Sequence, residues 1–207
     1  MTDAEVTPTD VTPAEESEIK VRGQEINNIQ ADSVTVQYAT TGDIQAKTVI
    51  VSQAGANNIE AETVELRQAG AQSVQGNTVN VRQGGMVQAK AEKLTVVQGG
   101  FVFAEAGESN LTASTAGAIL AGGQVTLDQS AAKAILTRGD VTMDQSGTGV
   151  LVARQVRTGD NSGAIIMLAG RVDGEVNSVF GPVARAAFGV AFAAVLALIL
   201  WLRRRLF

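Results

Sequence analysis

The 207-residue chain contains neither cysteine nor histidine. Their absence excludes thiol nucleophiles, disulfide bonds, imidazole bases and most zinc or iron sites, and we expect no cofactor. Aromatic residues make up only 4% of the chain, and the formal net charge is −5. So few rings are unusual for a domain with a wide core. The acidic balance argues against nucleic acid as a partner, because phosphate contacts need clustered Lys and Arg.

Proline is nearly absent, and its placement is informative. The chain has only Pro8, Pro13 and Pro182, so residues 23–174 contain none. A proline lacks the backbone N–H that a strand ladder uses. The long central region can therefore form an uninterrupted ladder.

The central region contains a repeat of a short apolar-polar-apolar pattern. From about Ile26 to Gly174 the pattern recurs roughly every 15 to 17 residues, and a fixed period of this size predicts a solenoid. Its copies are Val34-Thr-Val36, Val49-Ile-Val51, Val64-Glu-Leu66, Val79-Asn-Val81, Leu94-Thr-Val96, Leu111-Thr-Ala113, Val125-Thr-Leu127, Val141-Thr-Met143, Val156-Arg-Thr158 and Val172-Asp-Gly174.

A second alternating piece precedes most of these copies, and a turn of small residues such as Gln53-Ala-Gly-Ala56 follows many of them. Alternation with a period of two is typical of strands with one buried face. We therefore expect an all-β solenoid, a parallel β-helix of about ten coils, with a C-terminal transmembrane α-helix added. The preceding pieces are Ile44-Gln-Ala46, Ile59-Glu-Ala61, Val74-Gln-Gly76, Val87-Gln-Ala89, Val102-Phe-Ala104, Ile119-Leu-Ala121, Ile135-Leu-Thr137 and Val150-Leu-Val152.

Composition divides the chain into four parts. Residues 1–22 are acidic and poor in apolar groups, which predicts a disordered tail without the apolar core of a signal peptide. Residues 23–174 form the solenoid, and residues 175–182 form a linker. Residues 183–207 are predicted to be a single-pass membrane anchor with a basic end.

The anchor prediction depends on residues 186–202, an unbroken run of apolar or small side chains. With its flanking residues the run is long enough to cross a bilayer as a helix, and a buried helix in a larger complex is the alternative. Trp201, Arg203, Arg204 and Arg205 would lie at the membrane interface. Gly189, Ala193 and Ala197 are spaced four apart, which can allow two membrane helices to pair.

Equivalent residues of a solenoid stack in columns. One column holds Gln53, Gln68, Gln83, Gln98, Gln129 and Gln145, with Thr115 at the break. It predicts a stacked amide ladder, with a polar binding strip as the alternative. Thr48, Thr63 and Thr78 form a column that could suggest ice binding, but Lys93 ends it. Asp128, Asp144 and Asp160 are interpreted as solvated turn residues, with calcium binding as the alternative.

The coil from Phe101 to Ala113 is the most irregular, since the step from Leu94 to Leu111 is the longest between successive copies of the repeat. If Val102 and Ala104 face inward, Phe101 and Phe103 form an exposed pair and a candidate contact site. If the register shifts, both rings are buried. The pattern does not decide between these alternatives.

The repeat resembles the bactofilins, which are polymer-forming bacterial cytoskeletal proteins. The resemblance covers residues 23–174 and is strongest at Leu168-Ala-Gly-Arg-Val-Asp-Gly-Glu-Val176. It implies a right-handed β-helix that polymerises end to end without nucleotide. The chain departs from the family in having about ten coils and a C-terminal spanning segment.

We therefore expect a non-enzymatic, membrane-anchored scaffold that forms a homo-oligomer or filament, with the lipid bilayer and an unidentified protein as partners. The alternatives are a surface-displayed binding or adhesion rod and a polysaccharide-active enzyme. Arg203–Arg205 should stay in the cytoplasm by the positive-inside rule, which would place the solenoid outside. Because no signal peptide is apparent, we instead expect tail anchoring with the solenoid on the cytoplasmic side.

Overall fold

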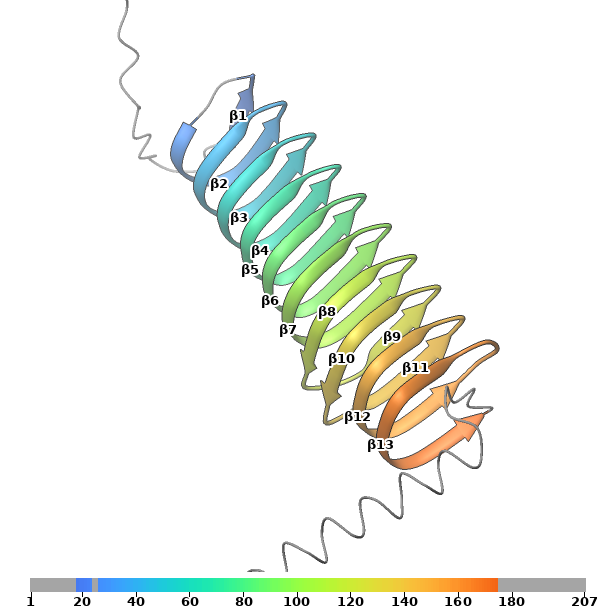
Figure 1. Ribbon diagram of the computed structural model, residues 1–207. Helices are drawn as coiled ribbons and strands as arrows, with labels where there is room; N and C mark the ends of the chain where they lie inside the picture. Colours follow the sequence, from blue (N-terminus) through green and yellow to red (C-terminus); the bar gives the residue numbers. More distant parts are fainter. Residues whose placement is uncertain (1–17, 24–25, 175–207) are drawn as a thin grey trace, which may run out of the picture.

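The computed structural model of the chain describes residues 18–23 and 26–174, and it shows a parallel β-solenoid of about ten turns (Figure 1). The described strands pair only in parallel, and each coil hydrogen-bonds to the coils before and after it. The coils stack into a straight rod, with the N-terminal coils at one end and β13 at the other. The predicted fold class is thus confirmed for the solenoid.

The strands are long in the N-terminal half, where one strand occupies most of a coil. In the next two coils each strand divides into two, so β8 and β9 share a coil, as do β10 and β11. The strands are β1 (Glu18–Arg22), β2 (Ile26–Gln37), β3 (Thr40–Ser52), β4 (Gly55–Arg67), β5 (Gly70–Arg82), β6 (Gly85–Val97), β7 (Gly100–Thr112), β8 (Thr115–Ala121), β9 (Val125–Asp128), β10 (Ala131–Thr137), β11 (Asp140–Asp144), β12 (Gly147–Thr158) and β13 (Gly163–Gly174).

Each coil has three faces, which follow from the spacing of its buried residues. In the coil of β4, one face buries Ile59 and Ala61, and the second buries Val64 and Leu66. The third face begins the next coil with Ala69 and Ala71. Two outward residues separate each inward pair from the next, so the chain turns a corner after every inward pair and closes a coil after three of them.

The third face corrects the sequence prediction. Segments such as Gln53-Ala-Gly-Ala56 were expected to be turns, yet Ala56 is buried and its segment forms part of the core. Ala, Gly and Ser occupy the first inward position of this face along the described rod. Such small side chains give almost no hydrophobic periodicity, although stacking with their neighbours buries them. These residues are Ala39, Ala54, Ala69, Gly84, Gly99, Ser114, Ser130, Ser146 and Ser162.

Five of these positions, Gly99 and the four serines, form a hydrogen-bonded ladder inside the rod. The N–H of Ser130 donates to Ser146 Oγ at 3.1 Å, and the N–H of Ser146 donates to Ser162 Oγ at 3.4 Å. Ser114 N–H donates to Ser130 Oγ in the same way. Ser130 Oγ in turn donates to the carbonyl of Asp128 at 2.7 Å. The buried hydroxyls therefore have partners, which offsets the cost of removing them from water.

The coils become longer by a single residue at one corner. Ala106 pairs with Ala121, whereas Ser109 pairs with Val125, so one additional residue enters between these two pairings. The predicted long coil from Leu94 to Leu111 was wrong, because Leu94 pairs with Ser109 and not with Leu111. Ser109 occupies a core position held by Val or Leu in other coils, and its buried hydroxyl has no partner among the described residues. This polar residue concealed the true register.

Three of the predicted first pieces were also out of register. Val87 and Val102 are exposed, and the inward pairs are instead Ala89 with Ala91 and Ala104 with Ala106. In β12 the inward residue is Leu151, which pairs with Ile135. Val87, Val102 and Val150 are each one of two consecutive outward residues at a corner, where the strict alternation is interrupted, so alternation alone assigned them to the wrong face.

The predicted boundaries are partly corrected. β1 (Glu18–Arg22) pairs in parallel with Ser33–Gln37 of β2, so the solenoid begins inside the segment predicted to be a tail. The last described strand, β13, extends to Gly174, and the residues after it lie outside the described residues. Among residues 18–23 and 26–174 no helix is long and apolar enough to cross a membrane. The predictions for residues 1–17, the 175–182 linker, Gly189, Ala193, Ala197, Trp201 and Arg203–Arg205 lie outside the described residues.

Candidate functional site

The glutamine column lies at the sharp corner between the second and third faces. The backbone at this corner is left-handed, a conformation that residues other than glycine rarely adopt. The φ angle lies between 50° and 55° at Gln53, Gln68, Gln83 and Gln98. Each N–H at this corner donates to the carbonyl of the next coil, for example Gln53 to Arg67 at 3.0 Å. Repeated along the rod, this bond offsets the cost of the unusual backbone. The residue type does not indicate this conformation, because glycine or asparagine is the usual residue at such φ values.

The predicted amide ladder is present along four coils. Gln53 Nε2 donates to Gln68 Oε1 at 2.9 Å, Gln68 to Gln83 at 3.1 Å, and Gln83 to Gln98 at 3.2 Å. Ala113 then occupies the corner, where Thr115 was expected. Gln129 and Gln145 resume the same left-handed position beyond it. The ladder therefore joins the coils of the N-terminal half.

Substitutions of Gln83 separate its two roles. Gln83→Val places a β-branched residue at positive φ and should lower the free energy of unfolding by about 1–3 kcal/mol. Gln83→Gly keeps the backbone conformation and loses only the amide bonds, so its cost should be about 1 kcal/mol or less. Urea denaturation followed by circular dichroism measures both. Equal losses in the two variants would show that the left-handed backbone is not the dominant constraint.

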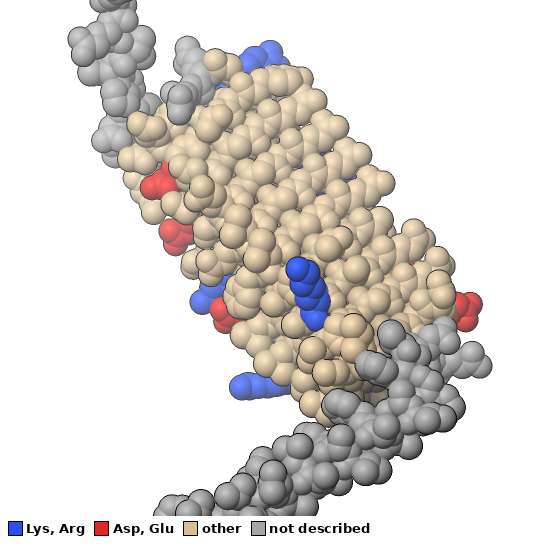
Figure 2. Space-filling model, in the orientation of Figure 1, with Lys and Arg blue, Asp and Glu red and all other residues tan. Residues whose placement is uncertain are grey.

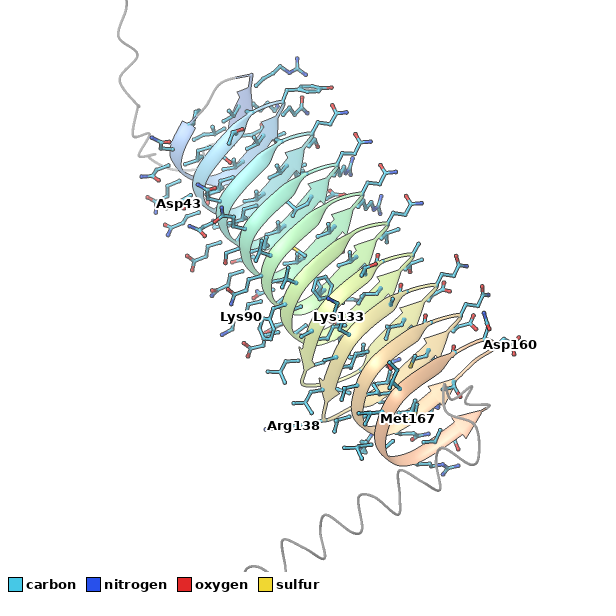
Figure 3. All side chains as sticks on the ribbon, in the orientation of Figure 1. Asp43, Lys90, Lys133, Arg138, Asp160 and Met167 are labelled. Atoms are coloured by element: carbon cyan, nitrogen blue, oxygen red, sulfur yellow. The ribbon has the colours of Figure 1, made fainter. Side chains whose placement is uncertain are left out.

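The aspartate column occupies the last outward position before the same corner. Asp128 pairs in register with Asp144, and Asp160 lies at the same edge of the rod (Figure 3). The carbonyls of Asp144 and Asp160 accept the corner N–H groups of Gln129 and Gln145. In the described part of the chain no group of three or more acidic side chains is arranged to hold a metal ion. The geometry is that of corner residues facing solvent.

The threonine column is also in register on the second face. Thr48, Thr63 and Thr78 pair in succession, preceded by Ser33 and followed by Lys93. Among the described coils, only three thus contribute threonine at this position.

Phe101 and Phe103 do not act as a pair. Phe101 is 6% exposed and lies inward on the third face, where it pairs with Met86 and Ala116. Phe103 is 37% exposed and faces outward. Both alternatives from the sequence are wrong, since the two rings lie on opposite sides of the strand. A contact site at this coil can use Phe103 but not Phe101.

Phe103 belongs to a larger apolar surface at the corner between the third and first faces, which we call the apolar corner. Two adjacent outward columns supply most of it. The first column runs Asp43, Asn58, Ser73, Gln88, Phe103, Ala118, Ala134, Val150, Ile166, and the second runs Gln45, Glu60, Gln75, Lys90, Glu105, Leu120, Leu136, Val152, Leu168. Both columns change from polar to apolar near the middle of the rod. Exposed large hydrophobic side chains are therefore concentrated in the C-terminal half.

A shallow groove of about 1000 Å³ runs along the next corner. Its floor is a column of small residues that includes Ala61, Gly76 and Ala91, and its walls include Glu60, Glu62 and Lys90. Small side chains between two rows of longer ones make the hollow. The groove has both charge signs along its walls, and Leu120 and Leu136 line its C-terminal part.

The last described coil ends in a charged cluster. Arg171 Nε donates to Asp173 Oδ1 at 2.9 Å, and Gln155 Nε2 donates to Asp173 Oδ2 at 2.7 Å. The hydrogen bond from Arg171 lowers the pKa of Asp173 below its ordinary value, and the bond from Gln155 acts in the same direction. Asp173 therefore remains ionised at neutral pH.

Comparison of the chain with protein-family models, with curated proteins and with solved structures found no match. The geometry defines the class of the protein as a parallel β-solenoid. Its distinctive surfaces are the amide ladder, the groove, the apolar corner and the two ends of the rod.

Proposed function

We propose that the protein is a non-enzymatic structural rod that self-assembles end to end and is held at a membrane by residues 183–207. The observation that carries the assembly proposal is the open end at β13. Met167 and Ala169 are partly exposed and Val172 is 42% exposed, whereas their partners Leu151, Ala153 and Val156 in β12 are buried. A further coil stacked on β13 would bury this apolar edge.

Backbone geometry supports the same proposal. β13 pairs with β12 on one side, and no described strand pairs with its other side. An unpaired strand edge is a template for another chain. β1 and β2 begin the rod at the opposite end, so a second copy could add its first coil in parallel. This mode of growth would need no nucleotide, as the resemblance to the bactofilins implies.

Assembly can be tested on the full chain in detergent. We expect filaments in negative-stain images and a mass that rises with protein concentration in light scattering. Val172→Lys should abolish filaments, because it places a charge in the contact between rods. Thr95→Lys, on an outward position of a middle coil, is the matched control and should assemble normally. Single rods of the unaltered protein at every concentration would contradict the proposal.

The anchor and its orientation form a separate part of the proposal. We propose that the solenoid lies on the cytoplasmic side of the membrane. Protease added outside intact cells should leave the solenoid uncut, whereas protease added to lysed cells should digest it. Cleavage in intact cells would place the solenoid outside and would favour a surface-displayed binding rod instead.

The groove favours a binding rod as the second candidate function. It crosses several coils and has walls of mixed charge, which suits an extended polymer better than a small substrate. A binding rod would require no contact between copies. Strictly single rods that retain the membrane anchor would therefore favour this candidate over the filament.

A further inference from the structure

The apolar corner changes from polar to apolar residues along the rod, whereas the second face and the corner after it do not. In the second column, charged Lys90 and Glu105 give way to Leu120 and Leu136 in the next two coils. The last residue of this column, Leu168, is 62% exposed. Contiguous exposed apolar surface is a feature of interaction sites in soluble proteins.

The change is confined to one side of the rod. In the same coils, the centre of the second face remains polar at Thr126, Thr142 and Arg157. The corner beyond it carries Asp128 and Asp144. Figure 2 shows the side that includes the third face, and uncharged surface covers most of it. The C-terminal half is therefore amphipathic across its width, with one apolar side and one polar side.

The apolar corner also carries positive charge. Lys133 lies in the middle of this side, and Arg138 projects at its edge, opposite Asp160 (Figure 3). Neither Lys133 nor Arg138 forms an ion pair with another described residue. Apolar side chains flanked by unpaired cations are the pattern by which proteins lie on anionic lipid surfaces.

The direction of the change agrees with a lipid partner. The corner becomes more apolar toward Gly174, and only residues 175–185 separate it from the apolar run 186–202. Fully extended, those intervening residues span at most roughly 40 Å. If the run enters a bilayer, the C-terminal coils are thus held close to its surface. A second copy packed along the whole rod would instead meet charged Glu60 and Lys90 in the same column.

We propose that the apolar corner of the C-terminal coils lies in the interfacial region of an anionic bilayer, so that this half of the rod rests along the membrane. The inference depends on the proposed anchor, since the anchor brings the corner to the lipid. Leu136, Val150 and Ile166 would contact acyl chains near the headgroups, and Lys133 and Arg138 would pair with lipid phosphates. The aspartate column would face water on the other side.

The absence of cysteine makes the test direct, because single-cysteine variants need no prior substitution. Leu136→Cys probes the apolar corner, and Thr142→Cys probes the second face of the same coil. Each full-length variant is labelled with a polarity-sensitive fluorophore and reconstituted into phosphatidylcholine vesicles containing phosphatidylglycerol and a lipid-attached quencher. We expect several-fold stronger quenching at position 136 than at 142, and weaker quenching without phosphatidylglycerol.

Vesicle flotation separates the ways in which the inference could fail. Flotation with equal, weak quenching at both positions would overturn the lipid contact and leave the anchor in place. Failure to float would overturn the anchor and, with it, the inference. A label at position 136 that is shielded from the lipid quencher, together with a disulfide between two copies of the unlabelled Leu136→Cys variant, would assign the corner to contact between rods. A shielded label without crosslinking would assign it to residues 186–202 of the same chain.

Discussion

Replacing Leu94 with alanine should lower the free energy of unfolding by about 2–5 kcal/mol. Leu94 is a fully buried inward residue of the second face, between Val79 in one neighbouring coil and Ser109 in the other. Truncation would leave a cavity that rigid ladders on both sides prevent from closing. Urea denaturation followed by circular dichroism measures the loss.

The Leu94→Ala substitution should also change the shape of the unfolding transition. Each coil contacts only its neighbours, so stability is set locally along the rod. The Leu94→Ala cavity should therefore weaken the junction between the two halves and broaden the transition. Val87→Ala removes methyl groups from an exposed position on another face of the rod and should cost less than about 0.5 kcal/mol. Equal losses for both variants would contradict the assigned register.

Replacing Gly139 with alanine should cost about 1–3 kcal/mol through overpacking. A Cβ at this position would press against the carbonyl group of Gly123 and would lie 2.9 Å from its Cα. These atoms belong to the backbone of the preceding coil, so no side chain can rotate away. The two glycines stack in the region of the longer coils, where the strands are interrupted.

Gly147→Ala is the matched control for this substitution. A Cβ at Gly147 would have no atom within 4 Å, and its φ is not positive. The control should therefore leave stability unchanged or raise it slightly, since alanine reduces the entropy of the unfolded chain. Thermal melts of the Gly139→Ala and Gly147→Ala variants, recorded under the same conditions, measure the difference in stability. A loss at Gly147 as large as that at Gly139 would show that close approach of the coils is not the cause.

The solenoid was predictable because its second face carries branched aliphatic residues in nearly every coil. Val34, Val64 and Val79 alternate with polar neighbours, so the period is visible without any structure. The third face was missed because alanine, glycine and serine are buried there by stacking and not by their own hydrophobicity. Register failed at Ser109, where one polar residue occupies a core position and shifts the apparent spacing.

The surfaces were predictable to different degrees. The glutamines repeat with the coil, and the ladder from Gln53 to Gln98 follows directly from that spacing. The left-handed backbone beneath it has no residue signature, since Gln is not a typical residue for positive φ. The apolar corner was not predicted from the sequence for a related reason. Val102 and Val150 lie beside inward residues, and alternation assigned them to the core until the strand pairing placed them outside.

The uniform coil length of the N-terminal half makes rod length adjustable by whole units. Removing residues 68–82 would join Arg67 to Gln83, and the equivalent corner N–H and carbonyl positions would still align. The rod would shorten by one strand spacing, roughly 4.8 Å, with every column preserved. A deletion of any other small size would rotate the remaining coils out of register. The distance between the two ends of the solenoid can therefore change only in steps of one whole coil.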